Sequence, residues 1–359
     1  MTSGDRVART FDPRTNSLNL FRLVLAAMVL FAHAFYIAGR GIGPHIQGEN
    51  LGGWAVAGFF VLSGFLITRS RFRHRLGDYL VLRMARILPA FWVCLLMTVV
   101  VFAPLALVLQ SRSLDGYLTT GPTPFSFLWS NWTLLMNQYD IGTTLAAVPY
   151  PGAWNGSLWS LYYEFACYLV VAAAGCFAVV RRSVTPLLVM WAVSVAVRAT
   201  DGHWASYQLD ERAVLLAKLL PYFLGGAVAH FVVDRYGLPH LLGAPALVLG
   251  VTALATIPHV GGQLAAPALA VGLIWLSTVL PQPRTIARHD ISYGFYIYAW
   301  PMQQLLVVAG LHDQGFVLYL LVSALVTAAM ATASWLLLER PVMRMAQTRV
   351  TASRSVTPV

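Results

Sequence analysis

Charged residues are scarce in this sequence of 359 residues. Only 11% are Asp, Glu, Lys or Arg, whereas 58% are hydrophobic, and the mean hydropathy is +0.67. A soluble domain carries roughly 25% charged residues, so this chain lacks the polar side chains needed to cover a surface in water. The composition therefore excludes a cytosolic enzyme and a disordered scaffold. It also excludes a nucleic-acid-binding domain, despite the net charge of +10.

Residues that build metal or acyl-enzyme sites are also few. The three cysteines, Cys94, Cys167 and Cys176, lie in apolar stretches without metal-ligand spacing, which indicates buried packing. Ser63 lacks the G-x-S-x-G pattern of a hydrolase nucleophile, and no His is followed by an Asp five residues later. The sequence therefore predicts no metal site and none of the soluble hydrolase or soluble acyltransferase centres.

Apolar runs recur along the whole chain. A helix needs roughly 17–25 such residues to cross about 30 Å of hydrocarbon. The first run contains Arg22 and His33 and is too long for a cleaved signal peptide. The Pro-, Trp- and Asn-rich segment 122–151 is expected to be an outer loop with interfacial or re-entrant pieces. The pattern predicts an all-α polytopic membrane protein with ten spans, near residues 17–38, 51–68, 87–110, 155–180, 183–199, 213–233, 241–257, 264–280, 291–309 and 316–338.

The basic residues favour one side of this arrangement. Ten spans place both termini on the same side, and one set of alternating loops holds 18 basic residues against 5 in the opposite set. Because cytoplasmic loops are enriched in Lys and Arg, both termini are predicted to be cytoplasmic. The expected organisation is a cytoplasmic tail over 1–16, a ten-helix transmembrane domain over 17–345, and a cytoplasmic tail over 346–359. The part of this tail from Thr348 to Val359 is expected to be polar and frayed.

Arg22 and His33 are ionisable groups inside the first span, where a charge costs at least about 2.5–3.5 kcal/mol near the bilayer centre. They are 11 residues apart, so their directions differ by about 20° and they lie roughly 16 Å apart along the helix axis. One face thus carries a cation near the cytoplasm and an imidazole in the outer half of the membrane. His suits proton transfer near neutral pH. Hydrogen-bonded packing is the alternative for His33, and snorkelling to the interface is the alternative for Arg22.

Glu164 is the acid that lies well inside a predicted span. It follows the outer start of that span by about ten residues, or roughly 15 Å, which is near the expected depth of His33. A carboxylate in this position suits the orientation of a His tautomer and the stabilisation of imidazolium. The alternative is a packing role, with hydrogen bonds to neighbouring Ser, Tyr or Arg side chains.

Two groups of arginines lie on the predicted cytoplasmic side. Arg83 and Arg86 are spaced i, i+3 and share one helical face, and paired guanidiniums suit phosphate recognition. The run from Arg69 to Arg75 is expected to anchor the chain at the cytoplasmic face or to contact anionic lipids. Anchoring is also the alternative role for Arg83 and Arg86.

In order and spacing, these features resemble the acyltransferase family 3 integral-membrane proteins. That family includes O-acetylases of bacterial surface polysaccharides and acyltransferases that modify macrolides. Tyr298-Ala299-Trp300-Pro301 departs from many relatives, which carry a His before the Pro. The resemblance covers nearly the whole chain and rests on Arg22-x10-His33, Gly58-Phe-Phe-x-x-Ser63-Gly64-Phe65, Arg83-x-x-Arg86, Trp159-Ser160-Leu-x-x-Glu164, Ser292-Tyr293-Gly-Phe-Tyr296, Trp300-Pro301 and Glu339-Arg340-Pro341.

The resemblance implies a multi-pass enzyme of a bacterial cytoplasmic membrane. It would transfer an acyl group, often acetyl, from cytoplasmic acyl-CoA to a hydroxyl of a sugar or polyketide acceptor. The implied partners are acyl-CoA, this acceptor and the lipid bilayer, with no nucleic acid. In the implied site, His33 and Glu164 are catalytic, Arg83, Arg86 and Arg22 hold CoA, and Trp159, Ser160, Ser63 and Tyr293 bind the substrate.

Several alternatives stay open at this stage. His33 would remove the proton of the acceptor hydroxyl as it attacks the thioester, or it would carry the acyl group itself. The competing function is a transporter or flippase for a lipid-linked sugar, with Arg22, His33 and Glu164 lining a polar path, although the two related halves typical of transporters are not evident. The sequence does not distinguish a surface glycan from a small hydroxylated metabolite as the acceptor. It also leaves the oligomeric state open.

Overall fold

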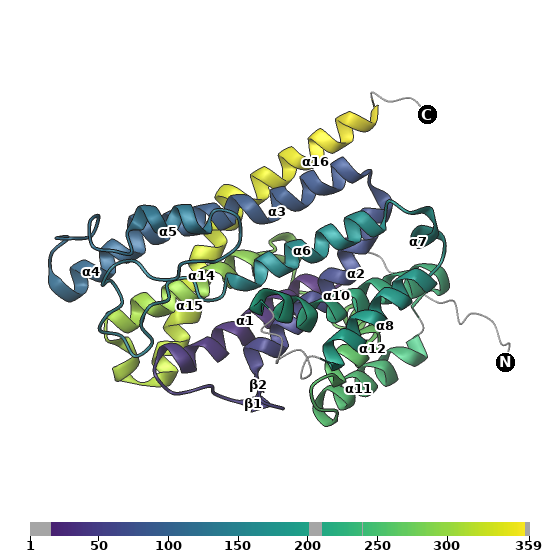
Figure 1. Ribbon diagram of the computed structural model, residues 1–359, viewed down its shortest axis with the longest axis horizontal. Coiled ribbons are helices and arrows are strands. Elements are labelled where there is room, and N and C mark those ends of the chain that lie inside the picture. Colours follow the sequence, from purple (N-terminus) through teal and green to yellow (C-terminus); the bar gives the residue numbers. More distant parts are fainter. Residues whose placement is uncertain (1–15, 201–209, 239, 356–359) are drawn as a thin grey trace. The chain divides into compact units, whose positions relative to one another are not determined.

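The computed structural model of the protein describes residues 16–200, 210–238 and 240–355. Within these ranges the chain is mostly helical, and its strands form one short hairpin, β1 (His45–Ile46) with β2 (Glu49–Asn50). The helices up to residue 199 are α1 (Leu18–Ile37), α2 (Leu51–Arg73), α3 (Leu76–Met97), π-helical η1 (Thr98–Phe102), α4 (Ala103–Ser111), α5 (Pro124–Asn131), α6 (Trp159–Ala174), α7 (Ala178–Arg182) and α8 (Thr185–Ala199) (Figure 1).

The second half of the chain continues in the same way. Its elements are α10 (Glu211–Tyr236), α11 (His240–Thr256), α12 (Gly261–Val279), α13 (Arg284–Arg288), α14 (Ser292–Val308), the 3-10 helix η3 (Leu311–Gln314), α15 (Phe316–Ser334), π-helical η4 (Trp335–Glu339) and α16 (Arg340–Ser355). All-α structure is confirmed for the described residues, and each predicted span coincides with a helix.

Six of these helical stretches are long and apolar enough to cross a membrane, so the described chain has the character of a multi-pass membrane protein. Helices α6, α8, α11 and α14 are shorter, at 16, 15, 17 and 17 residues. The count of ten spans therefore stays a prediction. The six candidate stretches are Leu18–Ile37, Leu51–Arg73, Leu76–Ser111, Glu211–Tyr236, Gly261–Val279 and Phe316–Ala352.

Two sequence-based boundaries are wrong. The span expected over 155–180 is helical from Trp159 to Ala174 and again, as part of α7, from Ala178. Its first residues are not helical, because Asn155 and Ser157 are buried in a turn before α6. The C-terminal segment expected to fray from Thr348 onward continues α16 as far as Ser355. One face of that extension packs against α3, where Leu82 contacts Ala346 and Val350. The expected tail over 1–16 lies almost entirely outside the described residues.

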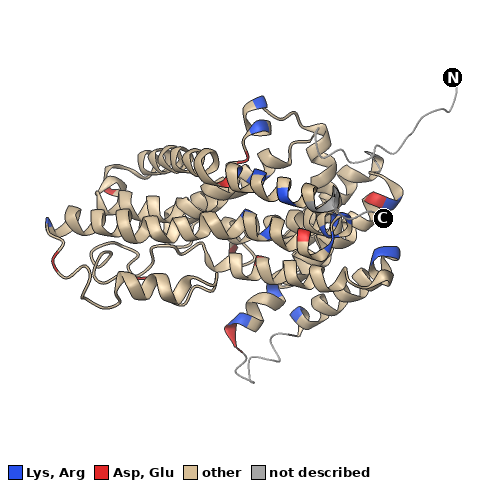
Figure 2. Ribbon diagram, turned by 90° about the horizontal axis from the view of Figure 1, so that it is seen from above, with Lys and Arg blue, Asp and Glu red and all other residues tan. Residues whose placement is uncertain are grey.

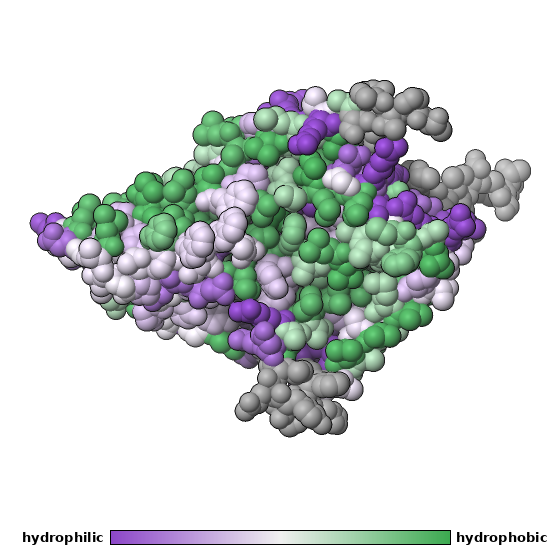
Figure 3. Space-filling model, turned by 45° about the horizontal axis from the view of Figure 1, so that its top comes forward, coloured by the Kyte–Doolittle hydropathy of each residue, from purple (hydrophilic) through white to green (hydrophobic). Residues whose placement is uncertain are grey.

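The surface has the apolar character that hydrocarbon requires. Acidic and basic residues occupy few positions along the ribbon in Figure 2, and hydrophobic side chains cover much of the face shown in Figure 3. A water-facing protein rarely exposes so many large apolar side chains together. The exposed ones include Val100 at 62%, Leu241 at 71%, Leu321 at 63%, Leu325 at 71% and Leu337 at 80%.

Prolines inside helices fit the same solvent. In water an internal Pro breaks a helix, whereas in a membrane bundle neighbouring groups satisfy the freed backbone positions. The helices α3, α10, α11, α12 and α14 each contain one, at Pro89, Pro221, Pro245, Pro267 and Pro301.

The chain divides into two compact units, which we describe separately. Unit 1 comprises residues up to 21, 56–79 and 163–287, and unit 2 comprises residues 22–55, 80–162 and 288 onward. In unit 1, α10 packs against α8 and α12, and α12 packs against α11. In unit 2, α14 packs against α15, which continues through η4 into α16, and α3 continues through η1 into α4.

Glycines allow the helices of unit 1 to approach one another closely. A Cβ added to Gly64 of α2 would come 1.9 Å from the backbone oxygen of Phe223 in α10, and one added to Gly226 of α10 would come 2.1 Å from the oxygen of Val61. Small residues at such crossings are typical of membrane helices, because packing rather than hydrophobic exclusion drives their association.

We predict that Gly64→Ala destabilises the protein. The added methyl group meets backbone and not a flexible side chain, so the helices must separate, and overpacking of this kind costs about 1–3 kcal/mol. Thermal unfolding in detergent should show a melting temperature several degrees lower. Gly77→Ala is the matched control, because a Cβ at Gly77 meets nothing within 4 Å. Equal melting temperatures for the two variants would contradict the prediction.

Candidate active site

Four charged residues form one cluster in unit 2. Arg22 Nη1 donates to Asp290 Oδ2 at 2.9 Å, and Arg86 Nη2 donates to the same oxygen at 2.7 Å. Arg86 also donates through Nη1 to Glu339 Oε2 at 3.3 Å. The cluster therefore joins α1, α3, the turn before α14, and η4. Two guanidiniums face two carboxylates, so the formal charges balance.

The cluster is buried and held by further contacts. The side chains of Arg86, Asp290 and Glu339 are 11%, 13% and 2% exposed. The guanidinium of Arg86 lies 5.6 Å from the ring centroid of Tyr293 and 5.9 Å from that of Trp335, which adds cation–π attraction. Arg86, Asp290 and Glu339 thus each have several partners, as buried charges require.

Hydroxyl groups donate further hydrogen bonds to the two carboxylates, and the hydroxyl of Tyr293 fixes the ring that lies beside Arg86. Ser292 Oγ donates to Asp290 Oδ1 at 2.5 Å, and Ser334 Oγ donates to Glu339 Oε1 at 3.0 Å. Tyr293 donates through its hydroxyl to the carbonyl of Ile87 at 2.8 Å. The π-helical turn η4 supplies both Trp335 and Glu339, and such turns are frequent at functional sites because they redirect side chains.

The ionisation of Asp290 follows from this arrangement. Burial alone raises the pKa of Asp290, but the guanidiniums of Arg22 and Arg86 and the hydrogen bonds from Ser292 outweigh burial and lower the pKa from its usual value of 3.8 to about 2. Asp290 is therefore an anion at any physiological pH. The lowered pKa also means that the folded state is stabilised by ionisation of this carboxyl group.

His33 lies on the same helix as Arg22, close to an aromatic side chain of α14. Helix α1 is continuous from Leu18 to Ile37, so the geometry expected for the pair, one face and roughly 16 Å of separation, holds. The imidazole and the Trp300 indole pack in a T-shaped arrangement, with ring centroids 4.6 Å apart and planes at 67°. Its Nδ1 atom is buried and has no hydrogen-bond partner among the described residues. This nitrogen is available to a ligand.

Trp300 is itself fixed on two further sides. Its Nε1 donates to the carbonyl of Ala153 at 2.8 Å. A Cβ added to Gly156 would come 2.5 Å from the indole, so the glycine lets the ring lie against the backbone. Trp300 therefore holds the imidazole of His33 from one side in a defined orientation.

Ser160 is bound to α14 by hydrogen bonds. Its hydroxyl and that of Tyr296 are 2.5 Å apart, and Tyr296 donates to the carbonyl of Ser157 at 2.7 Å. Ser160 is 5% exposed. Trp159, the first residue of α6, is half-buried. These contacts fasten the start of α6 to α14 within unit 2.

Glu164 and Ser63 are brought together in unit 1. Ser63 Oγ and the Tyr168 hydroxyl each donate to Glu164 Oε1 at 2.7 Å. Because α6 begins at Trp159, Glu164 lies only about 7.5 Å from the helix start, not the 15 Å expected from sequence. The hydrogen bonds match the alternative of a packing carboxylate. Since His33 belongs to unit 2, its assistance by Glu164 stays a prediction.

Arg83 and Arg71 differ in their burial and in their contacts. Arg83 is half-buried on α3, one turn before Arg86. Arg71 is 1% exposed, and its guanidinium donates to the carbonyls of Ala172 and His74 at 3.1 Å each. A guanidinium that binds the last carbonyls of a helix stabilises its end, so the expected lipid contact is wrong for Arg71.

One cysteine also departs from expectation. Cys94 and Cys167 are buried, whereas Cys176 is exposed, because it follows the end of α6 at Ala174. Its Sγ accepts from Arg71 Nη2 at 3.4 Å. Within the described residues, no three His, Cys, Asp or Glu side chains are grouped in a way that could hold a metal ion.

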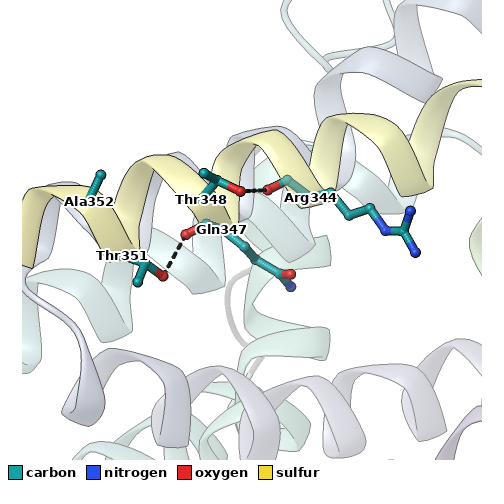
Figure 4. A pocket seen from close by; sticks show the side chains of 5 residues that line it. All are labelled: Arg344, Gln347, Thr348, Thr351 and Ala352. Carbon is teal, nitrogen blue, oxygen red and sulfur yellow. Dashed lines mark hydrogen bonds between the residues drawn. The ribbon is translucent and has the colours of Figure 1, made fainter.

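A surface groove of about 610 Å³ lies along α16 (Figure 4). None of the residues that line it belongs to the predicted site. The hydroxyls of Thr348 and Thr351 donate to the carbonyls of Arg344 and Gln347 one turn earlier, at 3.0 and 2.9 Å. These hydroxyls are therefore engaged within the helix. The groove is lined by Arg344, Gln347, Thr348, Thr351 and Ala352.

Comparison with known proteins identifies the chain's relatives. A family model described as "Acyltransferase domain" matches residues 15–339. The O-acetyl transferase of Shigella phage Sf6 is 27% identical over 335 residues, covering 91% of this chain and 96% of the relative. Nodulation protein 10 of Rhizobium leguminosarum bv. viciae is 27% identical over 386 residues, covering 95% and 96%. No solved structure matches the chain.

Sequence reasoning missed several residues of these clusters. Asp290 precedes the predicted span at 291 by one residue, and Glu339 follows the predicted span end at 338 by one, so neither lies inside a predicted span. The Glu339-Arg340-Pro341 motif is the available signal for Glu339. Trp300 belongs to the Trp300-Pro301 motif of the resemblance, but its contact with His33 is not encoded in any local pattern.

We predict that Asp290→Asn lowers stability, because Arg22 and Arg86 lose the carboxylate they share. Removing one partner of a buried pair costs roughly 3–5 kcal/mol, and the partial exposure of Arg22 at 25% places the expected loss at the lower end. The wild type should lose stability as the pH falls from about 4 toward the folded-state pKa of about 2, whereas the variant should lose less over that range.

Thermal unfolding between pH 7 and pH 2 measures both effects. Asp210→Asn is the control, because its pair with Arg212 is exposed, at 65% and 53%, and such pairs contribute about 0–1 kcal/mol. A stability of Asp290→Asn equal to that of the control, with an unchanged pH dependence, would show that the cluster does not stabilise the fold.

Proposed function

Because the chain belongs to the acyltransferase family whose model it matches over residues 15–339, we propose that it is an integral-membrane O-acyltransferase. The donor is acyl-CoA, with acetyl-CoA as the first choice because one relative is named an O-acetyl transferase. The acceptor is a hydroxyl of a sugar or another hydroxylated molecule. The observation that carries the proposal is the buried, unpartnered Nδ1 of His33, on a membrane-length helix in register with Arg22.

In this proposal the enzyme lies in a bacterial cytoplasmic membrane, with both termini in the cytoplasm. Each of the ten predicted spans coincides with a helix, and the 18 to 5 distribution of basic residues favours this orientation. The cluster of Arg22, Arg86, Asp290 and Glu339 then lies toward the cytoplasm, whereas His33 lies toward the outer half of the bilayer. Acyl-CoA approaches from the cytoplasmic side, because CoA is polyanionic and does not cross hydrocarbon.

The chemical step uses His33 as a general base. Its imidazole accepts the proton of the acceptor hydroxyl as the hydroxyl oxygen attacks the thioester carbonyl. The C–S bond then breaks, and the CoA thiolate leaves and takes up the proton, so the products are the O-acyl acceptor and free CoA. Trp300 holds the ring in place during this transfer. A covalent acyl-His33 intermediate, formed and then transferred to the acceptor, gives the same products.

The arginines divide between recognition and positioning. Asp290 and Glu339 compensate the charges of Arg22 and Arg86 and would repel a phosphate placed directly on them. We assign the CoA phosphates to Arg83 by its position, one turn before Arg86 on the same face of α3, and we assign Arg86 and Arg22 to the shape of the cytoplasmic entrance beside it. Tyr293 belongs to this entrance through its contact with Arg86, whereas Ser160 and Trp159 hold the turn that faces α14.

We predict that His33→Ala abolishes acyl transfer while the protein stays folded. The substitution removes the base, and its neighbour Trp300 remains anchored through Ala153 and Gly156. Purified protein in detergent should show no acetyl-CoA-dependent release of free CoA and no acetylated product by mass spectrometry. His230→Ala is the control, because His230 is another helical imidazole, buried at 4% exposure, and lies in unit 1. Full activity of His33→Ala would exclude His33 as the catalytic residue.

Glu164→Gln separates a catalytic role from a packing role for this residue. The amide oxygen of Gln still accepts the Ser63 and Tyr168 hydroxyls, so stability should change little, whereas the negative charge is lost. If the charge stabilises the imidazolium of His33, kcat should fall at least tenfold, and the pH profile of kcat should shift to lower pH, because loss of the charge lowers the pKa of the base. A normal kcat with an unchanged pH profile would show that Glu164 only packs the helices of unit 1.

A further inference from the structure

Two adjacent glutamines of α14 carry buried amide oxygens without partners. Gln303 and Gln304 are each 0% exposed, and the Oε1 atoms of both lack a hydrogen-bond partner among the described residues. A buried acceptor left unpaired is unfavourable, and most such groups in folded proteins are paired. Two of them side by side in sequence therefore need an explanation.

The orientation of both amides is fixed by their nitrogen atoms. Gln303 Nε2 donates to the carbonyl of Leu30 at 2.9 Å. Gln304 Nε2 donates to the carbonyls of Tyr150 and Ala153, both at 2.9 Å. Since a carbonyl only accepts, a rotation that exchanged the amide N and O would place two acceptors together. Each Oε1 is thus a fixed acceptor.

Both glutamines are neighbours of the His33–Trp300 contact. Leu30, which binds Gln303, lies one helical turn before His33 on α1. Trp300 lies three and four residues before Gln303 and Gln304 on α14, so the three side chains share one helix face. His33 Nδ1 is a third buried polar atom without a partner. The three unpartnered atoms thus belong to one region of unit 2.

Aromatic rings connect this region with the surface. Tyr150 is 39% exposed, and its ring centroid lies 5.6 Å from that of Trp300, which in turn lies 4.6 Å from that of His33. Aromatic walls with a few fixed polar groups are typical of sites for small organic molecules. The loop that holds Tyr150 also supplies the carbonyls that bind Gln304.

The position along the helices indicates which substrate these acceptors meet. On α14, Gln303 lies 11 residues after Ser292, or about 16 Å from the end at the charged cluster. On α1, His33 lies the same number of residues after Arg22. Acyl-CoA enters at the charged end in the proposed function, so the groups beyond the thioester at the other end belong to the acceptor.

We infer that Gln303 and Gln304 are specificity-determining residues that accept hydrogen bonds from two hydroxyls of a polyhydroxylated, sugar-like acceptor. A third hydroxyl of the same molecule then reaches His33. Neutral O–H groups match two uncharged acceptors beside aromatic rings. The inference rests on the proposed function and adds to it the residues that recognise the acceptor.

Single-hydroxyl deletions in the acceptor test this inference. The probes are acetyl-CoA with methyl glucoside, galactoside, mannoside and rhamnoside, the monodeoxy analogues of whichever is acetylated, and cyclohexylmethanol as an acceptor with one hydroxyl. For the wild type, deleting either hydroxyl that binds a glutamine should lower kcat/KM by about tenfold to a hundredfold, since a buried acceptor is then left unpaired.

The variants Gln303→Met and Gln304→Met should each abolish one of these penalties. In each variant the parent glycoside and one deoxy analogue should react with equal kcat/KM, and KM for acetyl-CoA should not change. A merely structural role would leave the penalties intact. Gln263→Met is the control, because Gln263 is a buried amide of unit 1, 3% exposed, that also donates to a carbonyl, that of Lys218.

Each result decides between outcomes. Unchanged deoxy penalties in both variants, or a raised KM for acetyl-CoA alone, would overturn the inference and leave the proposed function standing. So would acetylation of cyclohexylmethanol but of no glycoside. If the variants do not fold, a wild-type enzyme that tolerates every single deoxygenation outside the reacting hydroxyl within twofold would also overturn it. Absence of transfer to every acceptor would instead contradict the proposed function.

Discussion

Hydrocarbon offers no water to satisfy a buried polar group, so the polar side chains of a membrane protein must bind one another. Most polar side chains described above follow this constraint. Glu164 accepts two hydroxyls, Thr98 donates to Asn155 at 3.0 Å, and Ser160 binds Tyr296. His33, Gln303 and Gln304 each keep a buried atom outside any such pair. In the proposed function and the inference drawn from it, the substrates supply the missing partners of these three atoms.

The cluster of Arg22, Arg86, Asp290 and Glu339 shows how charged side chains near the ends of membrane helices are stabilised by pairing with one another. Asp290 joins Arg22 to Arg86, and Glu339 binds Arg86 from η4. Four elements of unit 2 that are distant in sequence are thereby tied together by groups whose charges cancel. Guanidiniums already paired with carboxylates bind phosphate weakly, but the ion pairs fix the positions of the helices that carry them. In the proposed function, Arg22 and Arg86 are therefore positioning residues.

Much of the fold follows from composition alone. Every predicted span coincides with a helix, because a backbone surrounded by apolar side chains and lipid can satisfy its hydrogen bonds only internally. Hydropathy was less successful at boundaries. The helix expected from 155 begins at Trp159, and the segment expected to fray from Thr348 remains helical to Ser355. Helix ends depend on local turns and on packing partners, such as Leu82 against Ala346. Hydropathy averaged over a stretch of sequence carries no information about either.

For the site, the sequence by itself determined which ionisable residues lie where membranes disfavour them and which of these share a helix face. Arg22 and His33 on one stripe of α1, and Arg83 with Arg86 on α3, follow from spacing within single helices. The tertiary structure decided the partners, since Asp290, Glu339, Trp300 and the two glutamines reach their neighbours across hundreds of residues. A helical repeat relates positions a few turns apart, whereas contacts between helices depend on packing that no local pattern encodes.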